Sequence, residues 1–536
     1  MLLNFHDEIN ILVSKSKTVQ YYKGIAIRGG GANLILFLAN HFHNSYVVEK
    51  IMIFSIFIVS VYIIWSVLSI DSFALQHSSL VVLSNDTVDS INPQFSTSQD
   101  RIYASWISNV NSQNSDVMFK KSDNDGKSFS KPINLSNSSG ISNIIKLRNS
   151  KNNVYITWED KQSDQWKLLF RKSQDYGKKF SNVLNISRGN GNVHLHDLSA
   201  EGKNVYVVWA ANENISSKIK EVYFRKSSNY GYSFGDTVNL SNIDDDSLDP
   251  HITTSHDGST IYIVWTECDI KEDDPICRIA FTKSLDRGNT FTIPKNVSDT
   301  TQFLKRKTSY HTQDSESKSN NLPQSYPINS TTGEKENYSI NPSVFTTFDG
   351  KIVYVLWEED LLSTGRTEVF LGVSNDYGKS FSSTINVSNT SGVSRLAQGQ
   401  LVDEDLYVVW SDTLDQYDKF NVMLKKVSSK NLSGKAINLS NNSGNSVSPS
   451  LLIKDDRIFT TWADESNTSS IWLWSGHVTG LSGLSGINTK LNGNSEAIPT
   501  NPVIFDTNDK AWIGWTENNN SRHKILLIAP EKMKSD

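Results

Sequence analysis

The segment Ser173–Phe180 reads SQDYGKKF, and its pattern returns along the chain. An Asp follows a Ser by two residues, a Gly follows the Asp by two, and an aromatic residue ends the segment. The Asp side chain can accept hydrogen bonds from turn N–H groups, while Gly permits a positive φ. Two further copies begin at Ser284 and Ser374, and copies with Asn in place of Asp begin at Ser122 and Ser227. We predict structural turn roles for Asn124, Asp175, Asn229, Asp286 and Asp376.

These turns belong to a repeat of roughly 50 residues that runs from Asn92 to the C-terminus. Each unit opens with a short apolar run, often at a Pro, which suits a strand's first residue because no ladder N–H is needed there. A third apolar run precedes the turn, and a short Asn-(Leu/Ile/Val)-Ser run follows it. The second apolar run ends in Trp in eight units, at Trp106, Trp158, Trp209, Trp265, Trp357, Trp410, Trp462 and Trp515.

The Ser-x-Asp-x-Gly-x-x-Phe pattern resembles the Asp-box, or BNR repeat, of sialidases and related propellers, and the resemblance covers nearly the whole chain after Leu80. It implies an all-β propeller whose four-stranded blades bury their faces by stacking around an axis. We predict about eight blades, with six or seven as alternatives, since sialidases have six. The last unit stops after its third strand, so the run SLVVLSN near Leu80 is expected to supply the fourth.

The stretch Ile51–Ile70 contains 20 residues without a charge, which matches a transmembrane helix. Five basic residues precede it, whereas the first one after it is Arg101, so the N-terminus is expected in the cytoplasm. We predict a single-pass signal anchor at the cell membrane with the rest of the chain extracellular. Cleavage near Ala74, followed by secretion, is the alternative.

This reading divides the chain into a cytoplasmic tail at residues 1–50, the membrane segment at 51–70 and a propeller at 78–530. Residues 299–339 are rich in Ser, Asn, Thr, Gln and Lys and have no Trp-ended run. We expect a flexible insertion between blades there.

An exterior location fits two further features. Cys268 and Cys277 are the only cysteines and flank the polar segment DIKEDDPI, so a hairpin can join them in a disulfide. About sixteen Asn-x-Ser/Thr sequons occur, although the repeat itself multiplies them. The sequons of the repeated strand ending are at Asn134, Asn185, Asn239, Asn296, Asn386 and Asn438.

The formal net charge is −5 and basic residues are dispersed, so no nucleic-acid partner is expected. The segments after the Trp residues are acidic and should share the face opposite the Ser-x-Asp turns. Glu159, Glu267 and Asp412 are candidates among them. Carboxylates gathered there could bind Ca²⁺ or sugar hydroxyls, but no cofactor is required by the sequence.

The most distinctive residues outside the repeat are His194, His196 and Asp197 in NVHLHD. A period of two would put both histidines on one face of a strand. His251 opens the next unit at a similar height, so a convergence near the axis with Glu159 or Glu267 is expected.

Sialidases clamp a substrate carboxylate with three arginines, carry an Arg-Ile-Pro-like motif near the N-terminus, and use a Tyr nucleophile with Glu and Asp. No Arg-Ile-Pro occurs in this chain, and an acidic mouth would repel an anionic sugar. We therefore favour a surface module that binds a carbohydrate or an envelope protein over an enzyme. The alternatives are an exo-α-sialidase or other glycoside hydrolase, and a structural glycosylated envelope component.

Overall fold

The computed structural model has two compact units, residues 1–78 and 79–536, each described by itself. It describes residues 4–15, 18–29, 32–38, 80–84, 88–111, 113–189, 191–214, 216–269, 276–298, 338–361, 364–382, 384–414, 419–440, 444–465, 469–477, 486–491, 497–508, 510–519 and 522–532. The predicted membrane segment at 51–70 and residues 299–337 of the predicted insertion lie outside these ranges. Among the described residues, no helix has the length and apolar character needed to cross a bilayer.

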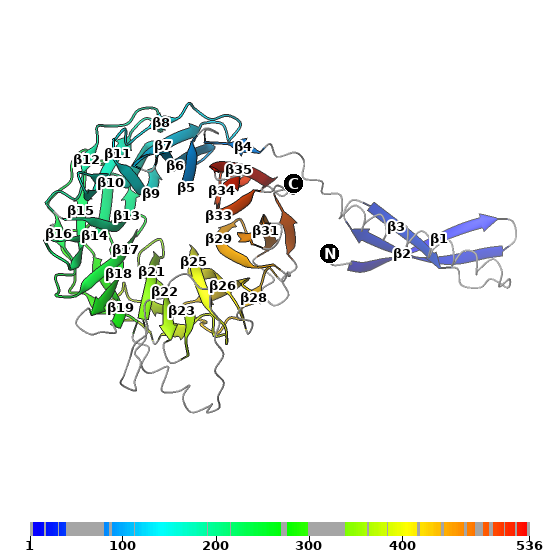
Figure 1. The fold of residues 1–536 in the computed structure, drawn as a ribbon. Helices are drawn as coiled ribbons and strands as arrows, with labels where there is room; N and C mark the ends of the chain where they lie inside the picture. Colours follow the sequence, from blue (N-terminus) through cyan, green and yellow to red (C-terminus); the bar gives the residue numbers. More distant parts are fainter. Residues whose placement is uncertain are drawn as a thin grey trace. The chain divides into compact units, whose positions relative to one another are not determined.

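The first unit contains an antiparallel sheet in the order β1 (Asn4–Lys15), β2 (Thr18–Gly29) and β3 (Ala32–Leu38). In the second unit, the described strands form eight four-stranded antiparallel blades arranged in a ring (Figure 1). The first two blades are joined in one sheet by a single parallel pair, Ser115 with Ile141. We number the blades 1 to 8 in chain order.

The strands take four positions in the blades. The innermost are β5 (Asp89–Ser98), β9 (Ile141–Ser150), β13 (Val193–Glu201), β17 (Asp246–Thr254), β21 (Tyr338–Thr346), β25 (Ser394–Val402), β29 (Ser446–Lys454) and β33 (Ile498–Asp506). The second are β6 (Arg101–Asn111), β10 (Asn153–Gln162), β14 (Asn204–Asn212), β18 (Ile261–Asp269), β22 (Val353–Leu361), β26 (Asp405–Asp412), β30 (Arg457–Asp464) and β34 (Lys510–Asn519). The third are β7 (Asn114–Ser122), β11 (Gln165–Ser173), β15 (Lys220–Ser227), β19 (Ile276–Ser284), β23 (Arg366–Ser374), β27 (Asn421–Ser428), β31 (Ser470–His477) and β35 (Arg522–Lys532). The outermost are β8 (Ile133–Asn134), β12 (Leu184–Asn185), β16 (Val238–Asn239), β20 (Lys295–Asn296), β24 (Ile385–Asn386), β28 (Ile437–Asn438), β32 (Ile487–Lys490) and β4 (Val81–Val82).

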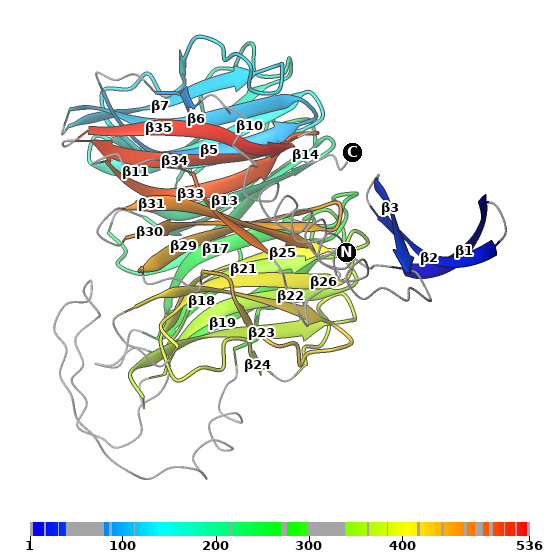
Figure 2. The same ribbon diagram turned by 90° about the vertical axis from the view of Figure 1, so that its right-hand side faces the viewer.

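Blade 8 is completed by the strand that comes first in this unit. β4 pairs antiparallel with β35, with Val82 opposite Leu526 and Val81 opposite Leu527. Leu83 is 1% exposed, and Ser84 Oγ accepts a 3.0 Å hydrogen bond from the Ile525 N–H. Figures 1 and 2 show β35 next to β5, so blade 8, once completed by β4, lies against blade 1. The predicted closure of the ring is observed.

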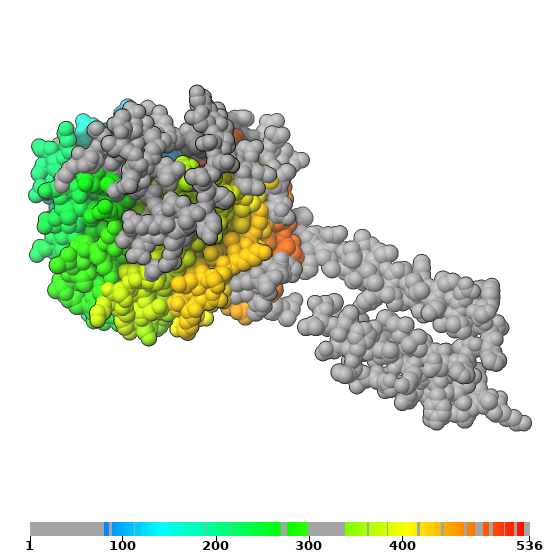
Figure 3. Space-filling view, turned by 90° about the horizontal axis from the view of Figure 1, so that it is seen from below, coloured from blue at the N-terminus to red at the C-terminus, as the bar shows by residue number. Residues whose placement is uncertain are grey.

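The second strands form the core between blades. They are buried on both faces because each blade is covered by a neighbour on either side, which explains their almost uninterrupted apolar sequences. In one cluster, Tyr354 and Leu356 of blade 5 pack with Leu406 and Trp410 of blade 6. Figure 3 shows the blades from green to orange packed side by side.

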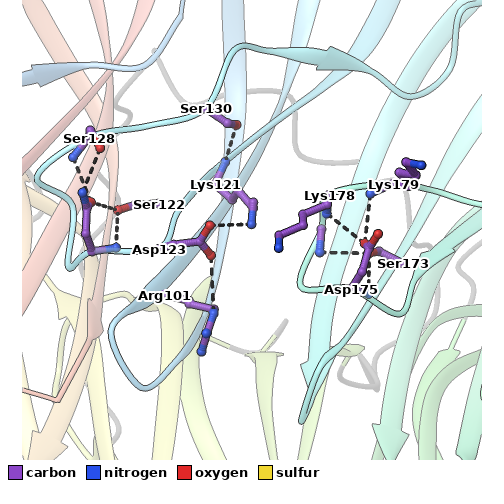
Figure 4. Close-up of polar contacts among 12 residues, drawn as sticks. Arg101, Lys121, Ser122, Asp123, Ser128, Ser130, Ser173, Asp175, Lys178 and Lys179 are labelled. Carbon is purple, nitrogen blue, oxygen red and sulfur yellow. Dashed lines mark hydrogen bonds and ion pairs between the residues drawn. The ribbon is translucent and has the colours of Figure 1, made fainter.

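The Ser-x-Asp turns follow the predicted local chemistry. Asp175 Oδ1 accepts hydrogen bonds from the Ser173 hydroxyl at 2.7 Å and from the Lys178 and Lys179 N–H groups at 3.0 and 2.9 Å (Figure 4). Gly177 has φ +76°. The carboxylate thus fixes a turn that only a residue tolerant of positive φ can complete.

The aromatic residue of the turn packs against the neighbouring blade. The Phe180 ring in blade 2 meets Phe119 of blade 1 edge-on, with 4.9 Å between centroids. A Cβ on Gly177 would lie 2.9 Å from Phe119 Cζ, so the glycine is also needed for this close approach. The turn therefore joins neighbouring blades. The same edge-on pairing recurs at Phe234, Phe291 and Phe381.

Replacing Phe381 by Ala should lower the free energy of unfolding by about 2–3 kcal/mol, because the half-buried ring loses its edge-on contact with Phe281. Denaturant titration measures this change. Leu285→Ala is the matched control, since its side chain is 57% exposed in an equivalent turn, and should stay within about 0.5 kcal/mol of the parent. Equal midpoints for both variants would contradict the joining role.

The repeated Asn-(Leu/Ile/Val)-Ser segment has a structural basis in the outer strands. In blade 1, the Ser136 hydroxyl accepts a 3.0 Å hydrogen bond from the Val117 N–H, and Leu135 is fully buried. The Asn137 N–H donates to Asn134 Oδ1 at 2.8 Å. Each of the three residue types thus closes the blade's outer edge, so the fold alone accounts for the recurrence of this sequon.

Candidate functional site

Each innermost strand contains one β-bulge, which changes the direction of the polar side chains that follow it. Each of these eight strands has one non-glycine residue with φ between 40° and 57°. At this residue the pairing with the second strand of the blade shifts its register, as at Leu195 and Asp249. These residues are Asn92, Ile144, Leu195, Asp249, Asn341, Leu396, Ser448 and Asn501. A bulge adds one residue to a strand and redirects its neighbours.

The bulge at Leu195 overturns the prediction that His194 and His196 share a face. His194 pairs with Ala210 and His196 with Trp209, which are consecutive residues of β14. Consecutive residues of a strand face opposite sides, so their partners do too. His194 lies near Lys220 and Asp246, and burial together with the Lys220 charge lowers its pKa.

His196 is buried between blades 2 and 3. Its Nδ1 lies 3.2 Å from Glu159 Oε1, and its Nε2 lies 3.0 Å from Thr157 Oγ1. Both residues come from β10 of the preceding blade. His196 and Glu159 are 2% and 4% exposed, so this pair is a part of the blade interface.

Asp197 is the centre of the candidate site. Its Oδ1 lies 3.5 Å from Arg148 Nη2 and 3.9 Å from Lys146 Nζ, and its Oδ2 lies 3.6 Å from His251 Nδ1. The Ile252 N–H donates to Oδ2 at 3.2 Å. Although burial opposes ionisation, the three cations and the hydrogen bonds hold the pKa of Asp197 far below its usual range.

His251 is held in its charged form by two carboxylates. Its Nε2 lies 3.5 Å from Asp249 Oδ1, on the far side of the ring from Asp197. Burial alone would lower the pKa of His251, but the contacts with Asp197 and Asp249 outweigh it and raise the pKa to about 9. The imidazole is therefore cationic at neutral pH.

The raised pKa of His251 predicts a pH dependence of stability. A histidine whose pKa is higher in the folded state stabilises fully below its unfolded pKa of about 6.5, and this contribution is lost as pH rises through about 9. The free energy of unfolding should fall by about 1–3 kcal/mol between pH 6.5 and 9.5. His251→Gln should flatten this slope in denaturant titrations at several pH values, whereas His256→Gln, an exposed histidine, should leave it unchanged. Equal slopes in the parent and His251→Gln would refute the ion pairs.

The predicted acidic mouth is wrong in its main feature. The carboxylates two residues after Trp158, Trp357 and Trp410 are Asp160, Glu359 and Asp412, and each is at most 1% exposed. They accept the indole N–H of their own Trp, at 3.4, 2.9 and 2.8 Å. The Trp side chain buries the acid that follows it, so Asp412 is a packing residue and lies in blade 6, away from the histidines.

Glu267 also lies apart from the histidines. It lines a pocket of about 420 Å³ between blades 3 and 4, opposite Arg278 in the β18–β19 pair. Burial raises the pKa of Glu267. One position farther along both strands, Cys268 and Cys277 form a disulfide.

The structure thus pairs His196 with Glu159 and, separately, Asp197 with His251, and leaves Glu267 and Asp412 elsewhere. Within the described ranges, no group of three or more His, Cys, Asp or Glu side chains could hold a metal ion. Lys146, Arg148 and Asp249 were not among the site residues predicted from the sequence. The alternation of Lys146 and Arg148 along one strand was the available signal.

Among the described residues, the arginines of the innermost strands do not form a clamp around the axis. Arg148 and Arg395 are on innermost strands, but in blades 2 and 6, which are opposite one another in a ring of eight. Arg278 and Arg366 are on third strands. Arg225 instead donates to the Ile186 carbonyl of the preceding blade at 3.0 Å.

No protein-family model matches the chain, and no curated protein matches it in sequence. Among solved structures, the chain is similar to a PL25 ulvan lyase, with TM-score 0.46, 10% identity and coverage of 84% of this chain and 96% of that one. It is also similar to a Penicillium chrysogenum α-L-arabinanase (0.35, 11%, 64% and 95%) and to a Trypanosoma rangeli sialidase (0.32, 8%, 65% and 56%). At these values the assignment of the fold rests on the strand pairing above.

Proposed function

We propose that this chain is a membrane-anchored exterior module of the sialidase-like propeller type, which binds glycans carrying an anionic group at the inner strands of blades 2–4. The observation that carries the proposal is the convergence of Lys146, Arg148 and His251 on Asp197. Among the described residues, the recorded ion pairs of these three cations are with Asp197 and Asp249, so the five groups together carry one net positive charge.

The exposure of these groups favours binding of an anion. The Asp197 side chain is 6% exposed, whereas those of Lys146, His251 and Arg148 are 25%, 29% and 45% exposed. The buried carboxylate thus positions the more exposed cations. The Arg148 guanidinium donates one N–H to the Leu147 carbonyl and one to Asp197, and its other N–H groups suit a carboxylate or sulfate group. The exterior location is supported by the apolar stretch at 51–70 and is compatible with the disulfide.

Binding is favoured over hydrolysis because the carboxylates of this site already have partners. Glu159 contacts His196, and Asp197 contacts three cations and a backbone N–H. A glycoside hydrolase needs two carboxyl groups facing one glycosidic bond, one as acid and one as base or nucleophile.

A glycan array with uronate, sialylated, sulfated and neutral sugars tests the proposal. Binding should be confined to anionic glycans and should weaken as salt is raised. Arg148→Ala should reduce affinity at least about 10-fold, which corresponds to the loss of one charge-assisted contact. Arg287→Ala, an exposed arginine in a Ser-x-Asp turn, should have no effect.

A fluorogenic sialoside supplies a second readout, and no release of sialic acid is expected. Release at ordinary enzymatic rates, about 1–10³ per second, would contradict the binding role. Equal binding of neutral and anionic glycans would contradict the assigned cations.

A further inference from the structure

We propose that N-linked glycosylation is selective among the repeated sequons, and that Asn296 and Asn185 are its acceptors while Asn386 and Asn438 are not. This inference rests on the exterior location in the proposed function. The six repeated sequons have nearly the same sequence, Asn-(Leu/Ile/Val)-Ser, and occupy equivalent places at the ends of outer strands. Their side-chain amides nevertheless have different surroundings.

The difference comes from one position of the third strand. In each blade, the middle residue of the sequon donates its N–H to a third-strand carbonyl, as Val387 does to Val369 and Val297 to Ile279. The residue just before that carbonyl contacts the sequon Asn in blades 5 and 6, and in blade 4 it lines the same pocket as the sequon Asn. It is Asp116, Lys167, Glu221, Arg278, Glu368 and Asn421 in blades 1 to 6.

Where this position carries a hydrogen-bond acceptor, the acceptor binds the Asn Nδ2, which is the atom to which a glycan would be attached. Asn386 Nδ2 donates to Glu368 Oε2, and Asn386 is only 8% exposed. Asn438 Nδ2 donates to Asn421 Oδ1 at 3.2 Å. Attachment of a glycan would leave either nitrogen with one proton for this contact, and at Asn386 it would also require opening the blade's edge around a buried amide.

Blades 2 and 4 have a basic residue instead, Lys167 and Arg278. Charged lysine and arginine have no acceptor atom, so neither can receive a hydrogen bond from the Asn amide. Asn296 is exposed and uses its Oδ1 to accept the Ser298 N–H at 2.9 Å, which leaves the turn intact when Nδ2 is modified. Asn185 is partly exposed.

Space is also present next to Asn296. The 420 Å³ pocket between blades 3 and 4 is lined by Asn296 together with Asn242, Glu267, Arg278 and Ile293. Ile293 is 91% exposed, an unusual state for a large apolar side chain. An attached sugar would cover this residue and meet polar groups at Glu267 and Asn242. The outer strands lie on the circumference of the ring, where an oligosaccharide can extend into solvent (Figure 1).

The reaction uses a lipid-phosphate-linked oligosaccharide as donor. The Asn Nδ2 attacks the anomeric carbon, a C–N bond forms, the bond from that carbon to the phosphate oxygen breaks, and the amide loses one proton. The product retains one N–H on the amide nitrogen.

Site mapping of the full chain, produced in a host that adds N-linked glycans in its secretory pathway, tests the selection. Treatment with a peptide-N-glycosidase in heavy-oxygen water hydrolyses the side-chain amide of each occupied Asn and converts it into a labelled Asp, which peptide mass spectrometry locates. We expect label at Asn296 and Asn185 in most folded chains and none at Asn386 and Asn438. Label at Asn386 or Asn438 in folded protein, or an absence of label at both Asn296 and Asn185, would overturn the inference.

Matched substitutions give a second measurement. Asn296→Gln should remove one glycan from the intact mass, whereas Asn386→Gln should leave the number of glycans unchanged. If Asn386→Gln fails to fold, the site map of the unsubstituted chain still decides. Label at any sequon shows that the chain was translocated, so the selection among sequons is judged independently of the anionic-glycan binding, which is measured separately on the array.

Discussion

Asp412→Ala is expected to lower the free energy of unfolding by about 3–5 kcal/mol. Its Oδ2 accepts the Trp410 indole N–H at 2.8 Å and the Ser394 hydroxyl at 2.9 Å, and its Oδ1 accepts the Leu414 N–H at 2.6 Å. The side chain is fully buried, so removal of the carboxylate leaves several donors without water or a partner. Denaturant titration followed by Trp fluorescence measures the loss.

Glu404→Ala is the control for this prediction. Glu404 lies in the turn before the same strand, and its ion pair with Lys430 is exposed, so a loss of at most about 1 kcal/mol is expected. Asp412→Asn should be intermediate, because it retains one acceptor oxygen. If Asp412→Ala unfolds at the same denaturant concentration as Glu404→Ala, the carboxylate does not support the Trp.

Removal of the closing strand should have an effect at least as large. A chain that begins at residue 88 lacks β4, and with it the pairing to Leu526 and Leu527, the buried Leu83 and the Ser84 acceptor. Loss of one buried Leu alone costs about 2–5 kcal/mol, and exposure of the β35 edge adds to that. We expect a loss of more than about 4 kcal/mol, a large part of a typical domain stability of 5–15 kcal/mol. Thermal unfolding of the purified protein measures it.

A chain that begins at residue 79 is the matched control and should unfold like the parent. A synthetic peptide of residues 79–87 should restore stability to the shorter chain, because an added strand can complete an open edge. The closure is refuted if the chain starting at residue 88 is as stable as the one starting at residue 79, or if the peptide has no effect.

The propeller architecture could be predicted because each repeat unit contains short sequence patterns that are typical of its turns and strands. The residues of the Ser-x-Asp turn and of the Trp-ended run interact within a few positions of the chain, so their recurrence predicted a unit of four strands. The segment SLVVLSN could then be matched to the fourth strand that blade 8 lacks. The structure adds contacts between blades that no single unit reveals, such as Phe180 against Phe119.

The candidate site was only partly predictable for the same reason. His251 could be grouped with His196 and Asp197 because it lies on the first strand of the next unit, and Glu159 could be added because it follows a Trp-ended strand. The bulge at Leu195 was not visible, since no Pro or Gly marks it there, and it reversed the face of His194. The prediction of an acidic mouth was wrong because an acid two residues after Trp was expected to be exposed. At Asp412 the carboxylate is instead buried and accepts a hydrogen bond from the indole N–H of Trp410.

The pairing of β4 with β35 sets the order in which the protein can be completed. Residues 81–84 leave the ribosome before the strand they pair with, and Ile525 follows Ser84 by 441 positions. During that interval β4 has no partner and blade 1 has no neighbour on one side. Contacts of such long separation form late and slowly. While it waits, β4 can add to the open blade 8 of a second chain, so strand-exchanged dimers are the characteristic by-product to look for when this protein is synthesised at high concentration.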